Sequence, residues 1–153
     1  MKLISLAVLM LSVAATPALA EDWVLATVSD DSSAALLIDV DTIGDEAGGI
    51  HGLRVLTVMK VTTQSFDALV SDVRVDCGAH KIRVGRTSAH DLTGKQLLVE
   101  EDGPELGWDA VTPGSNYDTV VKMVCQETPM SKAHYGAKMP IAKVRAELVR
   151  RGS

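Results

Sequence analysis

The sequence predicts an α+β fold: an antiparallel β-sheet of about six strands with a C-terminal helix packed on it, plus a short C-terminal basic amphipathic helix. Three observations lead to this prediction. Apolar and polar residues alternate in several short runs that are separated by turn-forming residues. One stretch after residue 115 changes to helical spacing. The final residues then combine an apolar stripe with several cations behind a linker.

The first residues have the pattern of an export signal. Lys2 precedes an apolar run, and Ala18-Leu19-Ala20 has the small-x-small form of a cleavage site. The apolar run is shorter than the roughly 20 residues of a membrane-spanning helix. No cysteine follows the cleavage site, so we expect a periplasmic or secreted protein without a lipid anchor. The expected division is a signal peptide at 1–20, an α+β domain at 21–127, and a linker with a basic amphipathic tail at 128–153.

The charge is unevenly distributed between the domain and the tail. Residues 21–127 contain nineteen Asp and Glu against eight Lys and Arg, whereas residues 128–153 contain six Lys and Arg against Glu147 alone. Nucleic-acid binding requires a basic face, so we expect no nucleic acid as a partner of the domain. Aromatic residues make up 3% of the chain. The core is therefore expected to consist of aliphatic side chains.

The strands are expected in a meander. They cover residues 23–29, 34–39, 53–62, 70–77, 81–87 and 96–101. Both alternating faces of 53–62 carry apolar side chains, which favours a central strand covered on both sides. The glycine-rich stretch 44–52 is expected to be a loop. The four histidines, which are expected in turn-like segments, are His51, His80, His90 and His134.

One helix is expected to follow Ser115. The Ser115 side chain is placed to accept a bond from the amide of Asp118, whose charge suits the first turn of a helix. The apolar stripe at helical spacing is Tyr117, Val120, Val121, Val124 and Cys125. Three valines in this stripe have a low helix propensity, so tertiary packing is expected to hold the helix.

The chain contains two cysteines, Cys77 and Cys125. Alternation places Cys77 on the same face as Val73 and Val75, where a buried disulfide is expected. A disulfide is favoured in an exported chain. The alternative is a zinc site, because Cys77 and His80 have a Cys-x-x-His spacing to which Cys125 adds a third ligand.

Several residues occur together in a recognisable order. They are Trp23, Asp39 with Thr42-Ile43 behind it, Asp76-Cys77, Trp108, Val111, Pro113-Gly114-Ser115 and Cys125. Over residues 23–125 this pattern resembles the surface-adhesin protein E family. The resemblance implies an antiparallel sheet crossed by a helix in an exported bacterial protein. It also implies protein ligands such as host matrix or envelope proteins, and a homodimer, because the best-known member binds host matrix and serum proteins and dimerises. It supplies no individual binding residue.

No motif in the sequence favours catalysis or a cofactor. The stretch that begins with Asp39 and Asp41 resembles the start of a calcium-binding loop. Ile43 and Ile50 occupy positions where such a loop needs oxygen ligands, so no metal site is expected. Ser88, His90 and Asp91 contain the residue types of a hydrolase triad, yet adjacent residues on an extended chain point to opposite faces. We therefore expect no enzyme, with a hydrolase as the weakest alternative.

The tail has two interpretations. Pro140 fits the first turn of a helix that extends to Arg151. Its apolar stripe is Ile141, Val144 and Leu148, and its candidate contact cations are Lys143, Arg145, Arg150 and Arg151. A one-layer sheet needs cover on both faces, which favours docking of the stripe on the domain's own sheet. The alternative is contact with an anionic membrane surface or a partner.

These observations lead to one functional hypothesis and one alternative. The hypothesis is an exported, non-catalytic, adhesin-like binding module for protein ligands, without a cofactor. The alternative is a periplasmic structural or accessory protein of the envelope, whose basic tail makes peripheral contact with the membrane or a partner.

Overall fold

The computed structural model describes residues 21–100, 107–130 and 133–152. Within these residues the strands are β1 (Trp23–Val28), β2 (Ala34–Glu46), β3 (Ile50–Thr63), β4 (Phe66–Asp76), β5 (Lys81–His90), β6 (Gln96–Glu100) and β7 (Asp109–Ala110). The helices are α1 (Asn116–Val124) and α2 (Ile141–Arg151). The predicted α+β class is confirmed.

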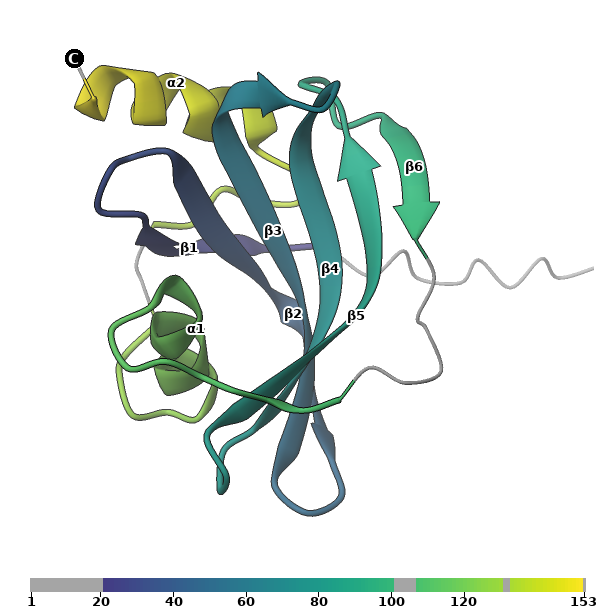
Figure 1. Ribbon diagram of the computed structural model, residues 1–153, viewed down its shortest axis with the longest axis vertical. Coiled ribbons are helices and arrows are strands. Elements are labelled where there is room, and N and C mark those ends of the chain that lie inside the picture. The colour runs from purple at the N-terminus through teal and green to yellow at the C-terminus, as the bar shows by residue number, and fades with distance from the viewer. Residues whose placement is uncertain (1–20, 101–106, 131–132, 153) are drawn as a thin grey trace, which may run out of the picture.

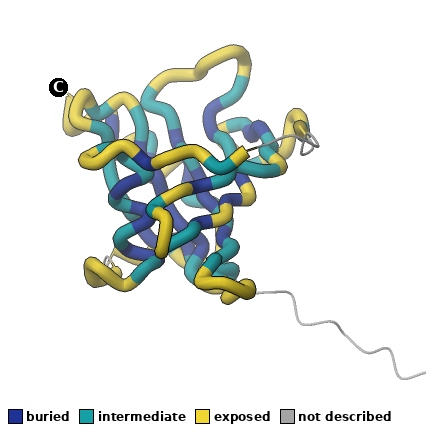
Figure 2. Tube along the Cα trace, turned by 60° about the horizontal axis from the view of Figure 1, so that its bottom comes forward, coloured by how far each residue is buried: buried dark blue, intermediate teal, exposed yellow. Residues whose placement is uncertain are grey.

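The strands form one antiparallel meander. β1 to β6 pair in chain order, and β7 pairs with β5 at Lys81 and Ile82. Figure 1 shows the sheet strongly twisted, with α1 beside its lower half and α2 across its upper end. The tube in Figure 2 shows that buried residues run through the strands, whereas most turns are exposed. Consecutive strands are therefore neighbours in space, as short connections favour.

One apolar core lies between α1 and the sheet. β3 contributes Leu53 and Val55 to this core. The remaining buried members from the sheet include Val24, Leu36, Ile38, Val73, Val75 and Ile82, and those from α1 are Val120, Val121, Met123 and Val124. The helical spacing predicted for 116–125 thus places its apolar stripe on the sheet.

A second apolar core lies on the opposite face, under α2. β3 contributes Leu56 and Val58, which alternate with the β3 residues of the first core. The other buried members are Trp23, Ala35, Leu37, Ala68 and Val70 from the sheet, and Ile141, Val144 and Leu148 from α2. The α2 stripe is at most 2% exposed, so it packs on the domain's own sheet. Neither helix in the described part of the chain is long and apolar enough to cross a membrane.

Residues 133–136, between the two helices, lie along the outer edge of β1. The Tyr135 amide donates to the Trp23 carbonyl at 2.8 Å, and the Leu25 amide donates to the Ala133 carbonyl at 3.2 Å. Val24 and His134 form an isolated antiparallel bridge. An exposed strand edge offers unpaired backbone groups to other chains. Here the segment 133–136 covers that edge before α2 begins.

The structure contains the disulfide Cys77–Cys125, with the two Cα atoms 5.6 Å apart. Cys77 follows β4 directly, and Cys125 is the C-cap residue of α1. The bond therefore ties the end of α1 to the β4–β5 turn. It also uses both sulfur atoms that the zinc interpretation required.

Two expectations were wrong. The loop expected at 44–52 belongs mostly to strands, because β2 continues to Glu46 and β3 begins at Ile50. Gly48 and Gly49 have φ values of 81° and 77° and form the tight turn that lets the strands extend. The histidines do not all lie in turns, since His51 lies in β3 and His90 in β5. In both cases cross-strand pairing outweighed local turn signals.

The disulfide is expected to supply much of the free energy of unfolding. The cysteines are 48 positions apart, and closing a loop of this size contributes about 4 kcal/mol in the chain-entropy model. A Cys77→Ala/Cys125→Ala variant should lose about this amount in urea denaturation. Intact mass after alkylation should show two accessible thiols only in reduced wild-type protein. Free thiols in the oxidised native protein would contradict the assignment.

The packing of α2 predicts a difference between two positions on one helix. Leu148 is 1% exposed and Val149 is 47% exposed. Leu148→Ala should cost about 2–5 kcal/mol of unfolding free energy, because it leaves a cavity against the sheet. Val149→Ala should cost less than about 0.5 kcal/mol. Equal effects in denaturant titrations would show that α2 does not share the core in solution.

Candidate functional site

The sequence motif around Pro113-Gly114-Ser115 organises the start of α1. The Ser115 hydroxyl accepts a bond of 3.2 Å from the Asp118 amide, as predicted. Gly114 has a φ of 79°, which favours glycine at this turn. Its amide donates to Asp118 Oδ2 at 2.8 Å. Turn and helix are thus joined by one buried carboxylate.

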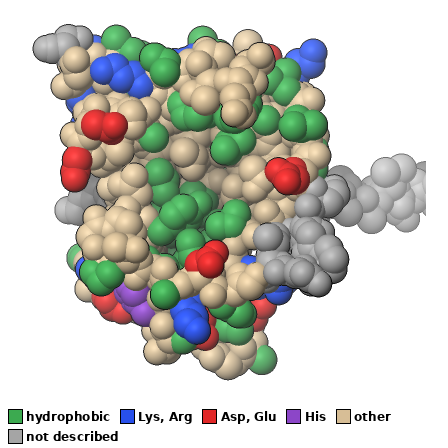
Figure 3. Space-filling model, in the orientation of Figure 1, with side chains coloured by type: hydrophobic (Ala, Val, Ile, Leu, Met, Phe, Trp, Pro, Cys, Tyr) green, Lys and Arg blue, Asp and Glu red, His purple; other side chains and the backbone are tan. Residues whose placement is uncertain are grey.

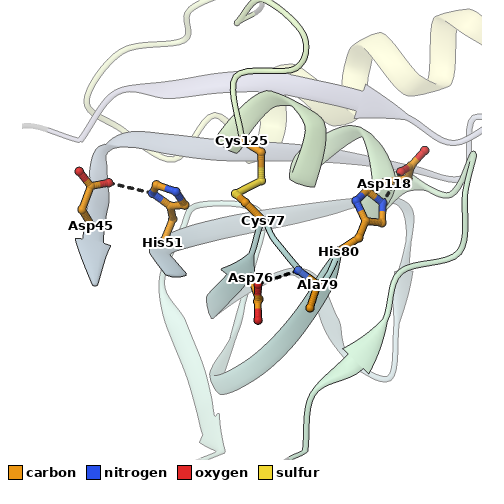
Figure 4. Close-up of a disulfide and its surroundings, with 8 residues drawn as sticks. All are labelled: Asp45, His51, Asp76, Cys77, Ala79, His80, Asp118 and Cys125. Atoms are coloured by element: carbon orange, nitrogen blue, oxygen red, sulfur yellow. Dashed lines mark hydrogen bonds and ion pairs between the residues drawn. A yellow bond between two sulfur atoms is a disulfide. The ribbon is translucent and has the colours of Figure 1, made fainter. Parts of the chain in front are cut away.

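Asp118 also connects α1 to the β4–β5 turn. Lys122 Nζ lies 2.8 Å from Oδ2, and His80 Nε2 lies 2.9 Å from Oδ1. The bonds from Lys122 and from the Gly114 amide lower the pKa of Asp118 to about 2. Figure 4 shows His80 reaching Asp118 close to the disulfide, while the neighbouring Asp76 accepts a bond from the Ala79 amide. Disulfide and carboxylate therefore hold α1 from two points.

The other residues singled out in the sequence surround this helix and the start of β1. Trp23 is fully buried under α2, and its Nε1 donates to Glu21 Oε2 at 3.2 Å. Trp108 is partly exposed just before β7, and Pro113 is exposed in the turn that follows β7. We therefore assign these residues a structural role and not a role in ligand contact.

The four tail cations have different surroundings. Arg145 is bound to Asp67, to the carbonyl of Lys60 and to Thr62. Lys143 Nζ lies 4.8 Å from the centre of the Tyr135 ring. Arg150 and Arg151 are exposed in the last turn of α2. Arg145 thus anchors the helix, and the other three cations lie along its outer side or end.

A polar groove lies on the α2 face of the sheet, next to the parts of β2, β3 and β4 that α2 covers, and it continues onto β5. It consists of two hollows of about 290 and 210 Å³ that share Arg54 and Asp72. Its charged and polar lining is Thr42, Glu46, Arg54, Asp72, Arg74, Arg83, Arg86, Ser88, His90 and Gln96. Figure 3 shows the other side of the molecule, where hydrophobic side chains gather over the sheet beside α1. The two faces therefore differ in chemistry.

The lining of the polar groove is basic, although the domain is acidic. Arg54 Nη1 binds Glu21 at 2.7 Å, and Arg74 Nε binds Glu46 at 3.0 Å. Arg83 lies directly opposite Arg74 in the β4–β5 register. Like charges that face each other across two strands are destabilising. The groove thus contains positive charge in excess of its acidic lining.

Ser88 and His90 form a hydrogen-bonded pair at one end of the polar groove. They are two residues apart on β5 and share a face, with Ser88 Oγ 2.8 Å from His90 Nε2. His90 Nδ1 lies 3.1 Å from the Gly94 carbonyl, so Nε2 of a neutral ring accepts from the serine. Asp91 binds Thr93 and the Lys95 amide instead. The described residues thus contain the serine and histidine without the carboxylate that orients a triad.

Metal ligands do not gather in the described ranges. No group of three or more His, Cys, Asp or Glu side chains there is arranged to hold an ion. Asp39 is fully buried at the β1 edge of the sheet, with its Oδ1 bonded to the Asp22 amide. Asp41 is exposed beyond it.

Sequence reasoning missed the polar groove. The signal was present in the alternation, because Arg54, Asp72 and Arg74 stand opposite the valines that face α1. Their significance depends on where α2 ends. That position follows from tertiary packing, which the alternation does not contain.

Comparison with known proteins gave two findings. A family model described as "Surface-adhesin protein E" matches residues 23–126. The crystal structure of protein E from non-typeable Haemophilus influenzae is similar at 13% identity and a TM-score of 0.46, over 83% of this chain and 88% of that chain. No curated protein matches the sequence.

Asp118 is expected to make the fold sensitive to acid. Because its pKa is lowered to about 2 in the folded state, its stabilising effect is complete above the unfolded value near 4 and is lost as pH falls towards 2. The Asp118→Asn variant should therefore unfold at a lower urea concentration than wild type at pH 7. The difference between their free energies of unfolding should shrink between about pH 4 and pH 2. Asp109→Asn, at an exposed position in β7, is the matched control. A constant difference across this pH range would contradict the assignment.

Proposed function

Because the chain belongs to the surface-adhesin protein E family, we propose that it is an exported, non-catalytic module that binds a protein ligand in the polar groove. The family model covers most of the α+β domain, from the first residue of β1 to the residue after the disulfide cysteine of α1. In the described residues, the groove is a concave surface whose arginines outnumber its acidic side chains. The ligand class we infer is an extended protein segment that carries carboxylates.

The cross-strand pair Arg74 and Arg83 is the observation that carries this proposal. Glu46 binds Arg74, and no acidic side chain in the described residues is bonded to Arg83. Guanidinium groups bind carboxylates through two parallel hydrogen bonds, which suits recognition of Asp or Glu side chains. A ligand carboxylate would relieve the repulsion between the two arginines. The free protein would therefore store repulsion that binding releases.

Export is supported by the sequence and by the disulfide. Residues 1–20 have the pattern of a signal peptide. The Cys77–Cys125 bond requires an oxidising compartment to form and persist. Both features support a folded domain outside the cytoplasm, where matrix or envelope proteins would be its ligands.

The alternative is an accessory protein of the envelope that acts through its tail. Arg150 and Arg151 remain exposed on the last turn of α2 and keep a cationic end on the domain. Arg145 is bound to Asp67 and does not contribute to such a surface. Release of the protein from washed membranes by an Arg150→Glu/Arg151→Glu change, without loss of ligand binding, would favour this alternative.

Charge reversal in the polar groove should separate binding from stability. Arg83→Glu replaces the like-charge pair with an attractive one, so the fold should be unchanged or gain up to about 1 kcal/mol. Binding to purified matrix and serum proteins, immobilised one by one, should fall at least about tenfold for the ligand that wild type binds. Arg150→Glu, on the exposed end of α2, is the matched control. Equal binding by wild type and Arg83→Glu would exclude the groove as the binding surface.

A further inference from the structure

A buried carboxylate lies where the chain enters β1. Asp39, on β2, is 0% exposed. Its Oδ1 accepts a bond of 3.1 Å from the Asp22 amide. Its Oδ2 is also buried and has no hydrogen-bond partner among the residues that the structure describes. An unsatisfied buried carboxylate oxygen is costly, so this atom requires a partner that donates a hydrogen bond and carries positive charge.

The nearest cation does not satisfy this atom. Arg54 Nη1 is 3.6 Å from Asp39 Oδ2 but only 2.7 Å from Glu21 Oε1. The other oxygen of Glu21 accepts a bond from Trp23 Nε1, and the guanidinium lies 5.5 Å from the centre of the Trp23 ring. Arg54 is thus held towards Glu21. Two carboxylates share one guanidinium, and the cluster lacks one positive charge.

The backbone just before β1 is bonded to the other oxygen of the same carboxylate. Asp22 is fixed at both of its backbone groups, because its amide binds Asp39 and its carbonyl accepts from the Val40 amide at 3.0 Å. One residue spans at most about 3.6 Å of chain. The nitrogen of Glu21 therefore lies at most about 3.6 Å from the nitrogen of Asp22. That Asp22 nitrogen is hydrogen-bonded to the Asp39 carboxylate. A charged group at this nitrogen would be within reach of Oδ2.

The sequence supplies such a group through processing. Ala18-Leu19-Ala20 precedes Glu21 and has the form of a signal-peptidase site. Cleavage after Ala20 converts the Glu21 amide into an α-ammonium group, which carries three donors and a positive charge near neutral pH. We propose that the cluster of Asp39, Glu21 and Arg54 is a binding site for this α-ammonium group, so that removal of the leader completes the fold. This inference rests on the proposed export and is independent of ligand binding in the polar groove.

The site has consequences for the unprocessed chain. Before cleavage the Glu21 nitrogen is an uncharged amide, and the burial of Asp39 raises the pKa of its carboxyl. The precursor then has either a protonated Asp39 or an unpaired buried charge, and each lowers the stability of the folded state. After cleavage the new ammonium balances the cluster. The folded state is thereby favoured on the side of the membrane where the leader is removed.

The charged groups that face this site come from each element around it. They are Glu21 and Asp22 before β1, Asp39 and Asp41 on β2, Arg54 on β3, and His134 from the segment 133–136. The Nδ1 atom of His134 lies 2.7 Å from Asp22 Oδ2. Asp41 is exposed and Asp39 is fully buried. Asp41→Asn is therefore a matched control for Asp39→Asn.

The test compares three N-termini on oxidised residues 21–153. One chain begins with a free amine at Glu21, one carries Gly-Ser before Glu21, and one is acetylated at Glu21. The free-amine chain should melt at least about 4 °C above the other two. Asp39→Asn should abolish this difference, and Asp41→Asn should preserve it. Equal melting temperatures for the three wild-type chains would overturn the proposal.

A second measurement remains decisive if Asp39→Asn fails to fold. The α-amine of wild type, labelled with ¹⁵N at Glu21 and titrated by NMR, should show a pKa raised above the ordinary range of about 7.7–8.0. An unshifted or lowered value would overturn the proposal. N-terminal sequencing of exported protein checks cleavage separately, and a mature chain that starts elsewhere would overturn the role of processing. None of these readouts depends on the binding assay, so failure of the ammonium site can be distinguished from failure of ligand binding in the polar groove.

Discussion

The structure depends on a single-layer sheet whose central strand is apolar on both faces. In β3, Leu53 and Val55 face α1, whereas Leu56 and Val58 face α2. Such a sheet is stable only if each face is covered. The two helices meet this requirement by different means. α1 is attached by the disulfide and by Asp118, whereas α2 is held by buried aliphatic side chains and by the Arg145–Asp67 ion pair.

Incomplete cover explains where the polar groove lies. α2 has 11 residues and its apolar stripe packs over part of β1 to β4. The rest of that face carries arginines, Asp72, Ser88 and His90, which are compatible with water. The same alternation that builds the second core thus leaves a charged concave surface beside it. A binding site at this position uses strands as its floor, which hold side chains more precisely than loops do.

The proposed function and the proposed ammonium site share one physical theme. In both places the numbers of positive and negative groups differ. In the groove, Arg83 faces Arg74. At the start of β1, the two carboxylates of Asp39 and Glu21 share the guanidinium of Arg54. Unbalanced charge costs stability when it is buried or crowded. In each proposal the imbalance is relieved by a partner that meets the chain after export, either a ligand carboxylate or the chain's own new N-terminus. An oxidising compartment of this kind also favours formation of the disulfide.

Local sequence patterns were sufficient for much of this architecture. Alternation located the strands, Ser115 and Asp118 located the start of α1, and the presence of two cysteines left one disulfide to form. The strands depend on short-range periodicity, and the start of α1 depends on a capping bond within one helical turn. The disulfide depends on there being two cysteines, which can pair with each other in one way. The packing of the α2 stripe followed from the need to cover both faces of a sheet.

Tertiary structure decided the features that depend on distant partners. The glycine-rich stretch 44–52 extends two strands because β2 and β3 pair through Gly44 and Gly52. His90 is buried in β5, and Arg54 lies between Glu21 and Asp39, which are 33 and 15 positions away in sequence. The polar groove exists because α2 ends where it does. Periodicity assigns a residue to a face, but only the register of the strands and the docking of the helices determine which charges meet there.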